Sequence, residues 1–595
     1  MKFIKNAGII AFATIINMSF GSFTEEQFRD LASQLREADR HGYDLKTIED
    51  ISVQLCGCSP EDKVDMYDSF ILLALGHSPE NLQACGRDKR ISTFNNLRDG
   101  NFDGCRKELE ELRKPSEKLY TLRLGGMVVD IDAVATIIKR QNWIAELRFL
   151  KGAIPYYESI TRITPLADAL KVNTTLTHLS LNDNVLKTEG IKLIADALKV
   201  NTTLTHLSLN GNMLKTEGIK LIADALKVNT TLTHLSLSSN NFGSEGVKFI
   251  ADALKVNTTL ERLDLACNGI GSQGAIDLSE ALRDNGTLSY LDLFSNGIED
   301  DGITALGNAL KNNETLIYLD LTYSKIGVPG ATALGLGLKD NRALVTLILS
   351  YNKIEDPVAS ALVEGLKDNR ALTYLDLSYN HIRSEGAKSI ADALKVNKTL
   401  LSLNLENNGI DDPGVTALAD ALKDNKTLLS LNLSRNVFDA SGVVNLAEAL
   451  KVNKTLACLT LQQCKIGHEG AKSIAEVLEV NEALCCLDLN WSKIDGSNGA
   501  RFLAEALKTN EALRYLCLRS TGIGVSGALE LSKMLKVNKS LVYVGLHYGD
   551  IGPDGEKELK EVLAKENTTI AIPFFEQNFN PASDIESQNG VILSF

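Results

Sequence analysis

The chain has 595 residues, of which 44% are hydrophobic and 23% charged, so most of it has the composition of a folded protein. Its formal net charge of −14 argues against a nucleic-acid-binding protein, because phosphate contacts need clustered Lys and Arg. An acidic surface suits a basic partner, although a solvated acidic coat is the commoner explanation.

The first residues carry the pattern of a secretory signal peptide. Two lysines precede an apolar run over residues 7–16 in which Thr14 is the one polar residue, and the small residues Ser19 and Gly21 favour cleavage after residue 21. The run is too short to be a permanent membrane span, and no other stretch of the sequence approaches that length. We therefore expect a signal peptide at 1–21 and a secreted or cell-envelope protein. A buried first helix or an uncleaved anchor is the alternative, and the former would leave the protein in the cytoplasm.

The next segment, residues 22–115, predicts a small helical domain. Apolar residues recur there at helical spacing, as at Phe28, Leu31 and Leu35, with charged residues between them. Glycine and proline interrupt the pattern at intervals. Such a domain would also cap the exposed apolar edge of a repeat protein, since a terminal repeat has no neighbour on one side.

A 28-residue repeat follows and occupies most of the chain. Each copy starts with the pattern L-x-x-L-x-L, as at Leu204. An exact period of this length means stacked units that present one long surface, which is typical of partner binding. The regular copies start at Leu176, Leu204, Leu232, Leu260, Leu288, Leu316, Leu344, Leu372, Leu400, Leu428, Leu456 and Leu484.

Less regular copies extend the repeat region at both ends. We count 16 strand units from Leu119 to Leu541, and a degenerate unit starts at Ile570. The predicted repeat domain therefore covers residues 116–570. The polar segment 571–595 lacks the period and is expected to be a tail.

One unit, residues 204–229, illustrates how a repeat should fold. Its strand leucines point into a core, and Asn212 lies where its side chain can satisfy backbone groups that turn out of the strand. Thr216 and Glu217 are expected to begin a helix, with Thr216 as its cap. Asn229 is expected to end that helix, because asparagine tolerates the left-handed conformation of helix C-termini.

This strand–asparagine–helix unit resembles the ribonuclease-inhibitor-like class of leucine-rich repeats, which also forms the C-terminal region of NOD-like receptors. The resemblance implies an α/β fold, namely a right-handed horseshoe-shaped solenoid with parallel strands on the concave face and helices on the convex face. The bend follows because strands stack about 4.8 Å apart whereas helices need about 10 Å. Irregular repeats are expected where the asparagine is replaced, at Ser324, Cys464, Ser492, Thr521 and Gly549.

The strand side chains that do not enter the core point to the concave face, at places three, five and seven of each unit when the anchor leucine is place one. Place three begins with a histidine in three successive units, which suggests a metal site or a pH switch. Copying is the stronger explanation, because residues 170–197 and 198–225 are nearly identical, and no carboxylate or cysteine joins the histidines. We therefore predict no metal site. The three histidines are His178, His206 and His234.

A patch of aspartates and aromatic residues follows on the same face. Asp264, Asp292 and Asp320 are expected to be neighbours in successive strands, where like charges repel one another. Such a column beside aromatic residues suits a partner that presents Lys or Arg, although duplication and a solvated face would also produce it. The predicted partner-binding residues are Arg262, Asp264, Tyr290, Asp292, Phe294, Tyr318, Asp320, Tyr323, Tyr351, Tyr374, Asp376 and Tyr379.

Two further residue patterns have structural explanations. Six cysteines in the repeats are interpreted as free thiols that act as small side chains, whereas Cys56, Cys58, Cys85 and Cys105 precede the repeats and could pair after export. Several Asn-x-Thr/Ser triplets match the glycosylation pattern but coincide with the asparagine at the end of a helix. They include Asn173, Asn201, Asn229, Asn257 and Asn567.

The sequence contains no motif of an enzyme. It lacks G-x-x-x-x-G-K-[ST], so the NACHT ATPase module of NOD-like receptors is not encoded in it. It also lacks H-E-x-x-H and G-x-S-x-G. We predict a non-enzymatic, monomeric interaction protein without a cofactor, which binds a protein partner through the concave face. The alternatives are an effector delivered into another cell that acts on host proteins, and a regulator like the Ran GTPase-activating proteins, which share this class of repeat.

Overall fold

A computed structural model describes the chain from residue 120 to residue 565, with short gaps. The described residues are 120–124, 131–140, 144–149, 151–152, 154, 159–546 and 548–565. The predicted signal peptide at 1–21, the helical domain at 22–115 and the tail at 571–595 lie outside the described residues, as do the four cysteines before the repeats and Asn567.

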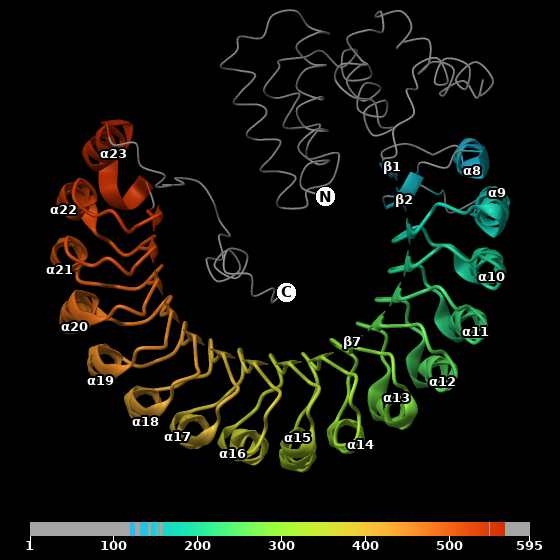
Figure 1. The fold of residues 1–595 in the computed structure, drawn as a ribbon, viewed down its shortest axis with the longest axis horizontal. Coiled ribbons are helices and arrows are strands. Elements are labelled where there is room, and N and C mark those ends of the chain that lie inside the picture. Colours follow the sequence, from blue (N-terminus) through green and yellow to red (C-terminus); the bar gives the residue numbers. More distant parts are fainter. Residues whose placement is uncertain are drawn as a thin grey trace, which may run out of the picture. The chain divides into compact units, whose positions relative to one another are not determined.

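The described residues form two compact units. The first holds the residues up to Phe242 together with Asp252–Asn268, and the second holds Gly243–Ala251 and the residues from Gly269 onward. Within each unit, parallel strands form one layer and helices cover one side of it (Figure 1). We call the other side of the strands, which the helices leave uncovered, the strand face.

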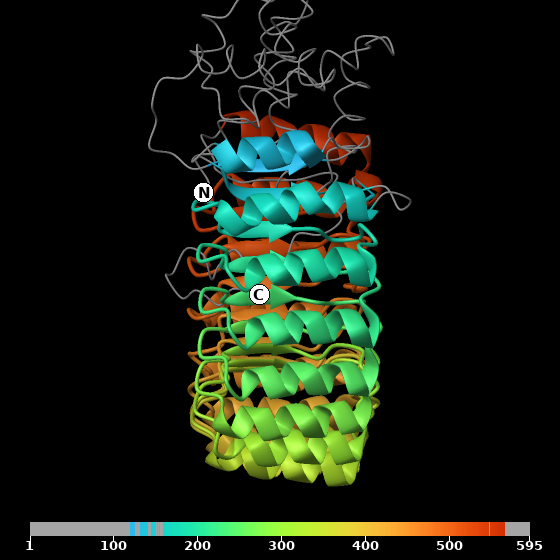
Figure 2. The ribbon, with the colours of Figure 1, turned by 90° about the vertical axis from the view of Figure 1, so that its right-hand side faces the viewer.

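The first unit alternates strands with helices along the chain. Figure 2 shows its helices side by side, with their axes nearly parallel. Helix α12 contributes its last residues to this unit and the rest to the second. The elements are β1 (Tyr120–Leu124), α8 (Ile131–Arg140), β2 (Ile144–Phe149), α9 (Ser159–Val172), β3 (His178–Ser180), α10 (Lys187–Leu198), β4 (His206–Ser208), α11 (Lys215–Leu226), β5 (His234–Ser236), α12 (Gly243–Leu254) and β6 (Arg262–Asp264).

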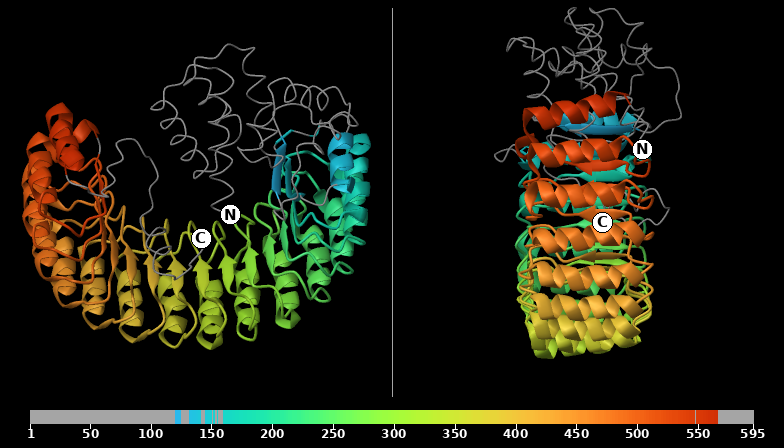
Figure 3. Two further views of the ribbon diagram at one scale, coloured as in Figure 1. Left: turned by 45° about the horizontal axis from the view of Figure 1, so that its top comes forward. Right: turned by 90° about the vertical axis from the view of Figure 1, so that its left-hand side faces the viewer.

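The second unit continues the alternation, and Figure 3 shows its helices stacked in the same manner. Its elements are α13 (Gly271–Asp284), β7 (Tyr290–Asp292), α14 (Asp300–Leu310), β8 (Tyr318–Asp320), α15 (Val328–Asp340), β9 (Thr346–Ile348), α16 (Asp356–Glu364), the 3-10 helix η2 (Gly365–Lys367), β10 (Tyr374–Asp376), α17 (Ser384–Val396), β11 (Ser402–Asn404), α18 (Asp412–Asp424), β12 (Ser430–Asn432), α19 (Ala440–Val452), β13 (Cys458–Thr460), α20 (Gly467–Val480), β14 (Cys486–Asp488), α21 (Gly496–Leu507), β15 (Tyr515–Cys517), α22 (Gly524–Leu535), β16 (Tyr543–Gly545) and α23 (Tyr548–Lys565).

Neighbouring strands within a unit pair in parallel, and the repeats align in register. In the first unit Leu179 pairs with Leu207, and in the second Leu291 pairs with Leu319, so equivalent places of successive copies lie side by side. The described residues contain 16 strands, β1 to β16, as the sequence count predicted. The predicted α/β repeat architecture, with strands and helices in alternation, is confirmed.

The core of each unit lies between the strands and the helices. In the repeat that starts at Leu204, the strand leucines Leu207 and Leu209 and the following Leu214 are all almost completely buried. Ile219 and Ile222 of α11 meet them from the helix side and are also buried. Burial of aliphatic side chains at about 25 cal/mol per Å² is therefore the main favourable term that holds each repeat to the next.

The asparagine after each strand links neighbouring repeats by hydrogen bonds. Asn212 donates through Nδ2 to the carbonyls of Leu181 (2.8 Å) and Leu209 (3.0 Å). Its Oδ1 accepts from the backbone N–H groups of Asn184 (3.2 Å) and Leu186 (3.3 Å). The predicted role of this asparagine, to satisfy backbone groups that leave the strand, is confirmed.

The helix starts differently from the sequence-based expectation. Helix α11 begins at Lys215 after Leu214, and no side chain caps it. Thr216 was expected to be the cap, but it lies inside the helix and its hydroxyl donates to the Phe242 carbonyl of the next repeat (3.2 Å). The physical reason is that the chain turns into the helix through a left-handed residue, Lys215 (φ 53°), which leaves no extended cap position for a threonine.

The expected left-handed end of the helix at Asn229 is also wrong. Asn229 does not have a positive φ, and the equivalent Asn285 is extended (φ −75°, ψ 120°). The extended backbone leads the chain into the next strand, and the Asn229 side chain holds the corner. It donates to the Leu198 carbonyl (2.7 Å) and accepts from the N–H of Leu232 (2.8 Å). These contacts explain the glycosylation-like triplets of the described repeats structurally.

The asparagine ladder is interrupted at Ser324, as the sequence predicted. The Ser324 hydroxyl and the Oδ1 atom of Asn352, one repeat later, are buried and have no hydrogen-bond partner. The serine side chain is too short to make the hydrogen bonds of a ladder asparagine, so its hydroxyl is left without a partner. Among the described residues, no helix combines the length and apolar character needed to cross a membrane.

Candidate functional site

The strand face carries the candidate functional residues, because the repeat places every second strand side chain there. In β4, for example, Leu207 is buried while its neighbours His206 and Ser208 are partly exposed. The same alternation holds in β7, β8 and β10, where a buried leucine lies between a tyrosine and an aspartate. The prediction that places three and five leave the core is confirmed for these strands.

In the first unit, the three histidines of place three form a stack. The rings of His178 and His206 lie 3.8 Å apart between centroids, and those of His206 and His234 lie 3.9 Å apart. Each Nδ1 atom lies 2.8–2.9 Å from the hydroxyl of the threonine that precedes it. The described residues contain no group of three or more His, Cys, Asp or Glu side chains arranged to hold a metal ion.

The threonine contacts determine which nitrogen of each histidine carries its proton. Thr205 Oγ1 donates its only proton to the Thr177 carbonyl (3.0 Å), so it can only accept from His206 Nδ1. The same contacts recur at His178 and His234. With the threonine protons on those carbonyls, each neutral imidazole is protonated at Nδ1 and bears its lone pair on Nε2.

Burial and mutual repulsion keep the stacked histidines neutral. Burial, followed by the charges of His178 and His234, lowers the pKa of His206 to about 4. Burial is also the main cause that lowers the pKa values of His178 and His234. Charged groups near the stack are Glu146, Arg148, Glu261 and Arg262.

The predicted patch is divided between the two units. Arg262, which is exposed, and Asp264 belong to the first unit, whereas the predicted residues from Tyr290 to Tyr379 belong to the second. The Asp264 carboxylate accepts from the Ser236 hydroxyl (2.6 Å) and from the N–H of Ala266 (3.0 Å). Asp264 is thus held by its own repeat and by the preceding one.

In the second unit, the structure brings the predicted tyrosines and aspartates of β7 and β8 together. Tyr290 pairs with Tyr318 and Asp292 with Asp320, and the two tyrosine rings stack with centroids 4.0 Å apart. Each aspartate also accepts a hydrogen bond from the backbone N–H two residues later. In the second of these strands, for example, the backbone N–H of Thr322 donates to Asp320 Oδ1, with 2.7 Å between the nitrogen and the oxygen.

A second aromatic row follows the strands at place eight. Tyr323 stacks on Tyr351 (4.7 Å between centroids), and Tyr351 stacks on Tyr379 (4.3 Å). Phe294 meets the ring of Tyr323 edge-on at 5.6 Å. Tyr323 and Tyr351 are 49% and 39% exposed, so this row presents aromatic surface to solvent.

The tyrosines of this row occupy a backbone conformation that bulky residues rarely adopt. Tyr323, Tyr351 and Tyr379 have φ values of 56°, 56° and 54°. This place is left-handed in other repeats as well, where it carries Gly211 and Asn407 but also Cys267, Arg435 and Trp491. Three successive tyrosines at such a place incur a local conformational cost, which is typical of functional surfaces.

An arginine of the chain itself closes the end of the tyrosine row. Arg435 donates from Nη1 to the Tyr379 hydroxyl (2.7 Å), which in turn donates to Glu406 Oε1 (2.9 Å). Arg435 Nε also lies 3.3 Å from that carboxylate oxygen. Burial and the bond to Glu406 raise the pKa of Tyr379 to about 12. Sequence reasoning missed Arg435 and Glu406, which lie two repeats and one repeat after Tyr379.

Burial affects the ionisation of two predicted carboxylates, those of Asp320 and Asp376. Desolvation raises the pKa values of Asp320 and Asp376 above their usual range, against the lowering effect of hydrogen bonds from Thr322 and Ser378. The charge of Asp320 also raises the pKa of Asp376. The two carboxylates therefore act on each other across the strand between them.

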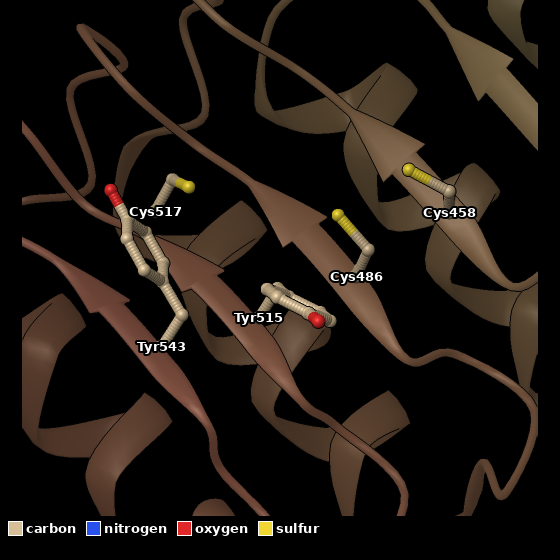
Figure 4. Close-up of a cluster of buried hydrophobic side chains, with 5 residues drawn as sticks. All are labelled: Cys458, Cys486, Tyr515, Cys517 and Tyr543. Atoms are coloured by element: carbon tan, nitrogen blue, oxygen red, sulfur yellow. The ribbon is translucent and has the colours of Figure 1, made fainter. Parts of the chain in front are cut away.

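A third group of residues on the strand face was not predicted as a site. Cys458, Cys486, Tyr515, Cys517 and Tyr543 form a buried cluster over β13 to β16 (Figure 4). Cys458 and Cys486 are register partners. All six cysteines among the described residues are free thiols, as interpreted from the sequence. The repeat period alone would have placed Cys458 beside Cys486, since both occupy place three.

A buried carboxylate lies beside this cluster. Asp488 is 1% exposed, and it accepts from Gln462 Nε2 (2.7 Å) and from the N–H of Asn490 (2.9 Å). Burial is the main cause that raises its pKa to about 6. Arg519, whose charge opposes that rise, also donates from Nη2 to the Tyr543 hydroxyl (3.4 Å).

Comparison with known proteins assigns the family. Residues 161–489, more than half of the chain, match the family model described as the NLRC3 LRR domain. No curated protein matches the chain. Among the solved structures that match is one titled "Leiomodin-1 Actin-Binding Site 2 (ABS2)", which is 21% identical with a TM-score of 0.22, over 31% of this chain and 88% of that chain. With its repeating strand–helix units and the matched residues, the chain belongs to the NLRC3 LRR domain family of leucine-rich repeat proteins.

Proposed function

We propose that this protein is a non-enzymatic scaffold that binds a protein partner through the strand face, mainly through the aromatic and acidic surface of the second unit. A leucine-rich repeat domain suggests a protein-interaction scaffold. The observation that carries the proposal is the row Tyr323, Tyr351 and Tyr379, in which aromatic rings stack at left-handed backbone positions and the first two are exposed. Rigid, solvent-facing tyrosines are the residue type that most often anchors protein interfaces.

The carboxylates beside the tyrosines define the kind of partner. Asp292, Asp320 and Asp376 lie between the tyrosines of place three and those of place eight, and the whole chain is acidic. A partner with a basic surface would gain charge complementarity there, while its apolar groups contact the rings. Arg262 and Asp264 belong to the first unit and stay predicted partner-binding residues, separate from the surface of the second unit.

Charge reversal on the strand face tests the proposal. We would compare the unchanged protein with Asp292→Lys/Asp320→Lys and with Glu479→Lys/Glu482→Lys, which makes the same charge change at exposed residues of α20 and the loop after it. The probe is a labelled peptide of alternating glycine and basic residues, titrated by fluorescence anisotropy. We expect the strand-face variant to lose at least about tenfold in affinity and the control to lose little. Equal affinity of the two variants would contradict the proposal.

We further propose that the protein is exported, on the basis of the charged start, short apolar run and small residues within 1–21. Sequencing the N-terminus of the mature protein from its natural source tests this. A new N-terminus after residue 21 is expected, and an intact 1–21 segment would contradict export by this route.

A further inference from the structure

The strand face of the second unit holds two guanidinium groups of its own, in similar surroundings. Arg435 contacts the Tyr379 hydroxyl and the Glu406 carboxylate. Arg519 donates to the Tyr543 hydroxyl, and its charge acts on the buried Asp488 carboxylate. Arg435 thus contacts both a tyrosine hydroxyl and a carboxylate of other repeats, whereas Arg519 contacts a tyrosine hydroxyl and acts on the Asp488 carboxylate through its charge. This face therefore has the chemistry to hold arginine side chains.

Tyrosines and carboxylates meet again at β8 to β10, on both sides of an uncharged repeat. Thr346 pairs with Tyr318 on one side and with Tyr374 on the other. Ile348 pairs likewise with Asp320 and Asp376. At β9 a short threonine therefore replaces the tyrosine of place three, and an aliphatic isoleucine replaces the aspartate of place five.

Within the described part of the second unit, no Lys or Arg forms an ion pair with Asp320 or Asp376. Asp320 accepts from Thr322, and Asp376 accepts from Ser378 and from Asn404 Nδ2 (3.0 Å). Burial makes both carboxylates harder to ionise, and each lies close enough to affect the other. Both carboxylates would therefore be stabilised in the charged form by one cation placed between them.

The spacing of the two carboxylates selects the kind of cation. Successive parallel strands lie about 4.8 Å apart, so Asp320 and Asp376, two strands apart, have backbones roughly 10 Å apart. One ammonium nitrogen, with hydrogen bonds of about 3 Å, reaches one carboxylate at a time. A guanidinium is wider and directs N–H groups to opposite sides, so it can bridge the pair. Its stem can lie along Ile348 and along Thr346, which is the residue between Tyr318 and Tyr374.

We propose that the partner supplies an arginine, whose guanidinium bridges Asp320 and Asp376 above Ile348. The inference rests on the proposed function and deepens it, since it names the side chain that the acidic surface recognises. Arg435 at Tyr379 and Glu406 is the intramolecular counterpart of this contact.

The test compares two labelled peptides that differ only in their basic residue, one with Gly-Arg repeats and one with Gly-Lys repeats. Fluorescence anisotropy gives the affinity of each for the full-length protein. We expect the arginine peptide to bind the unchanged protein at least about tenfold more tightly. Equal affinities would overturn the arginine inference and leave the acidic surface intact. Failure of both peptides to bind would overturn the proposed function as well.

Single substitutions of aspartate by asparagine show which carboxylates cause the preference for the arginine peptide. Asp320→Asn and Asp376→Asn are each expected to reduce the arginine-to-lysine ratio to about one, because a bridge needs both carboxylates. Asp292→Asn lies outside the bridge and should weaken both peptides to the same degree, so the ratio persists. These variants should fold, since Asn404 and Asn432 occupy the equivalent place and accept the same backbone hydrogen bond. An unchanged ratio in Asp320→Asn or Asp376→Asn would overturn the inference.

A variant that carries its own guanidinium completes the design. In Ile348→Arg the new side chain lies next to both aspartates in register. It should remove the preference for the arginine peptide, whereas Ile348→Leu should keep it. A full preference in Ile348→Arg would place the recognised arginine elsewhere and overturn the assignment.

Discussion

The backbone N–H of Asn212 donates a hydrogen bond to the side chain of Asn240, 28 residues later, at 2.9 Å. Asn240 in turn bonds the carbonyls of Leu209 and Leu237, so one side chain serves two repeats. The asparagine side chain of one repeat therefore satisfies backbone groups of the repeat before it. Stability is coupled along the chain through these asparagines as well as through the leucine core.

The break in this ladder at Ser324 predicts a stabilising substitution. In Ser324→Asn the longer side chain should reach the carbonyls of Leu293 and Leu321, as Asn212 reaches those of Leu181 and Leu209, and so replace the hydroxyl that has no partner. We expect the free energy of unfolding to rise by about 1–2 kcal/mol, measured by urea denaturation. Ser492→Asn is the matched control, because the Ser492 hydroxyl already donates to Leu461 and accepts from Cys464. Equal gains in both variants would contradict the explanation.

Replacement of the asparagine that follows a helix is predicted to cause a large loss of stability. Asn341 is 1% exposed and makes four hydrogen bonds, to the carbonyls of Leu310 and Asn313 and from the N–H groups of Ala343 and Leu344. Asn341→Ala should lower the free energy of unfolding by about 2–5 kcal/mol, because it leaves buried backbone groups without partners.

An exposed asparagine provides the control for that loss. Asn445 on α19 makes one exposed hydrogen bond to Thr416, so Asn445→Ala should cost under about 1 kcal/mol. Thermal and chemical denaturation of both variants measures the two losses of stability. A similar loss in the two would show that the corner asparagine has no special role.

The threonine contacts predict the tautomer of each stacked histidine. In protein labelled with ¹⁵N-histidine, nitrogen NMR shifts should show protonated Nδ1 and unprotonated Nε2 at His206. Thr205→Val removes the hydroxyl and should free His206 to take the other tautomer, while Thr205→Ser should not. His178 and His234 serve as internal references. Protonated Nε2 in the unchanged protein would contradict the assignment.

The lowered pKa of His206 predicts a loss of stability in acid. The folded protein keeps His206 neutral down to about pH 4, whereas an exposed histidine binds a proton near pH 6.5. The unfolded state therefore takes up the proton first, and stability falls as pH drops from about 6.5 towards 4. Urea denaturation across this window should show a smaller fall for His206→Gln. Parallel curves for the two proteins would rule out a contribution from His206.

The raised pKa of Asp488 predicts the opposite dependence of folding stability on pH. Its pKa of about 6 lies above the usual value, so the folded state holds the proton longer and stability falls as pH rises from about 4 to 6. Asp488→Asn should therefore be more stable at pH 7.5, by on the order of 1–3 kcal/mol, and should lose this advantage below pH 4. Asn404 and Asn432 show that the place accepts asparagine. A gain that does not vary with pH would exclude ionisation as its cause.

The sequence predicted the repeat architecture well, because the period fixes which residues share a place. The pairing of Asp292 with Asp320 and the stacks of tyrosines follow from counting 28 residues. Contacts that cross more than one repeat, such as Arg435 with Tyr379, depend on side-chain length and conformation, so the period does not reveal them. The helix boundaries were misjudged because Thr216 and Asn229 bond to neighbouring repeats instead of to their own helix.

The left-handed position that holds Tyr323, Tyr351 and Tyr379 recurs in nearly every repeat, with other residues in it. A surface of this kind can change length by duplication or loss of one whole repeat, which adds or removes one ring from the row. It can also move along the protein by single substitutions, since Asn407 or Gly211 already has the backbone that a new aromatic residue would need. Under the proposed function, the residues that select a partner can therefore change one repeat at a time while the fold stays the same.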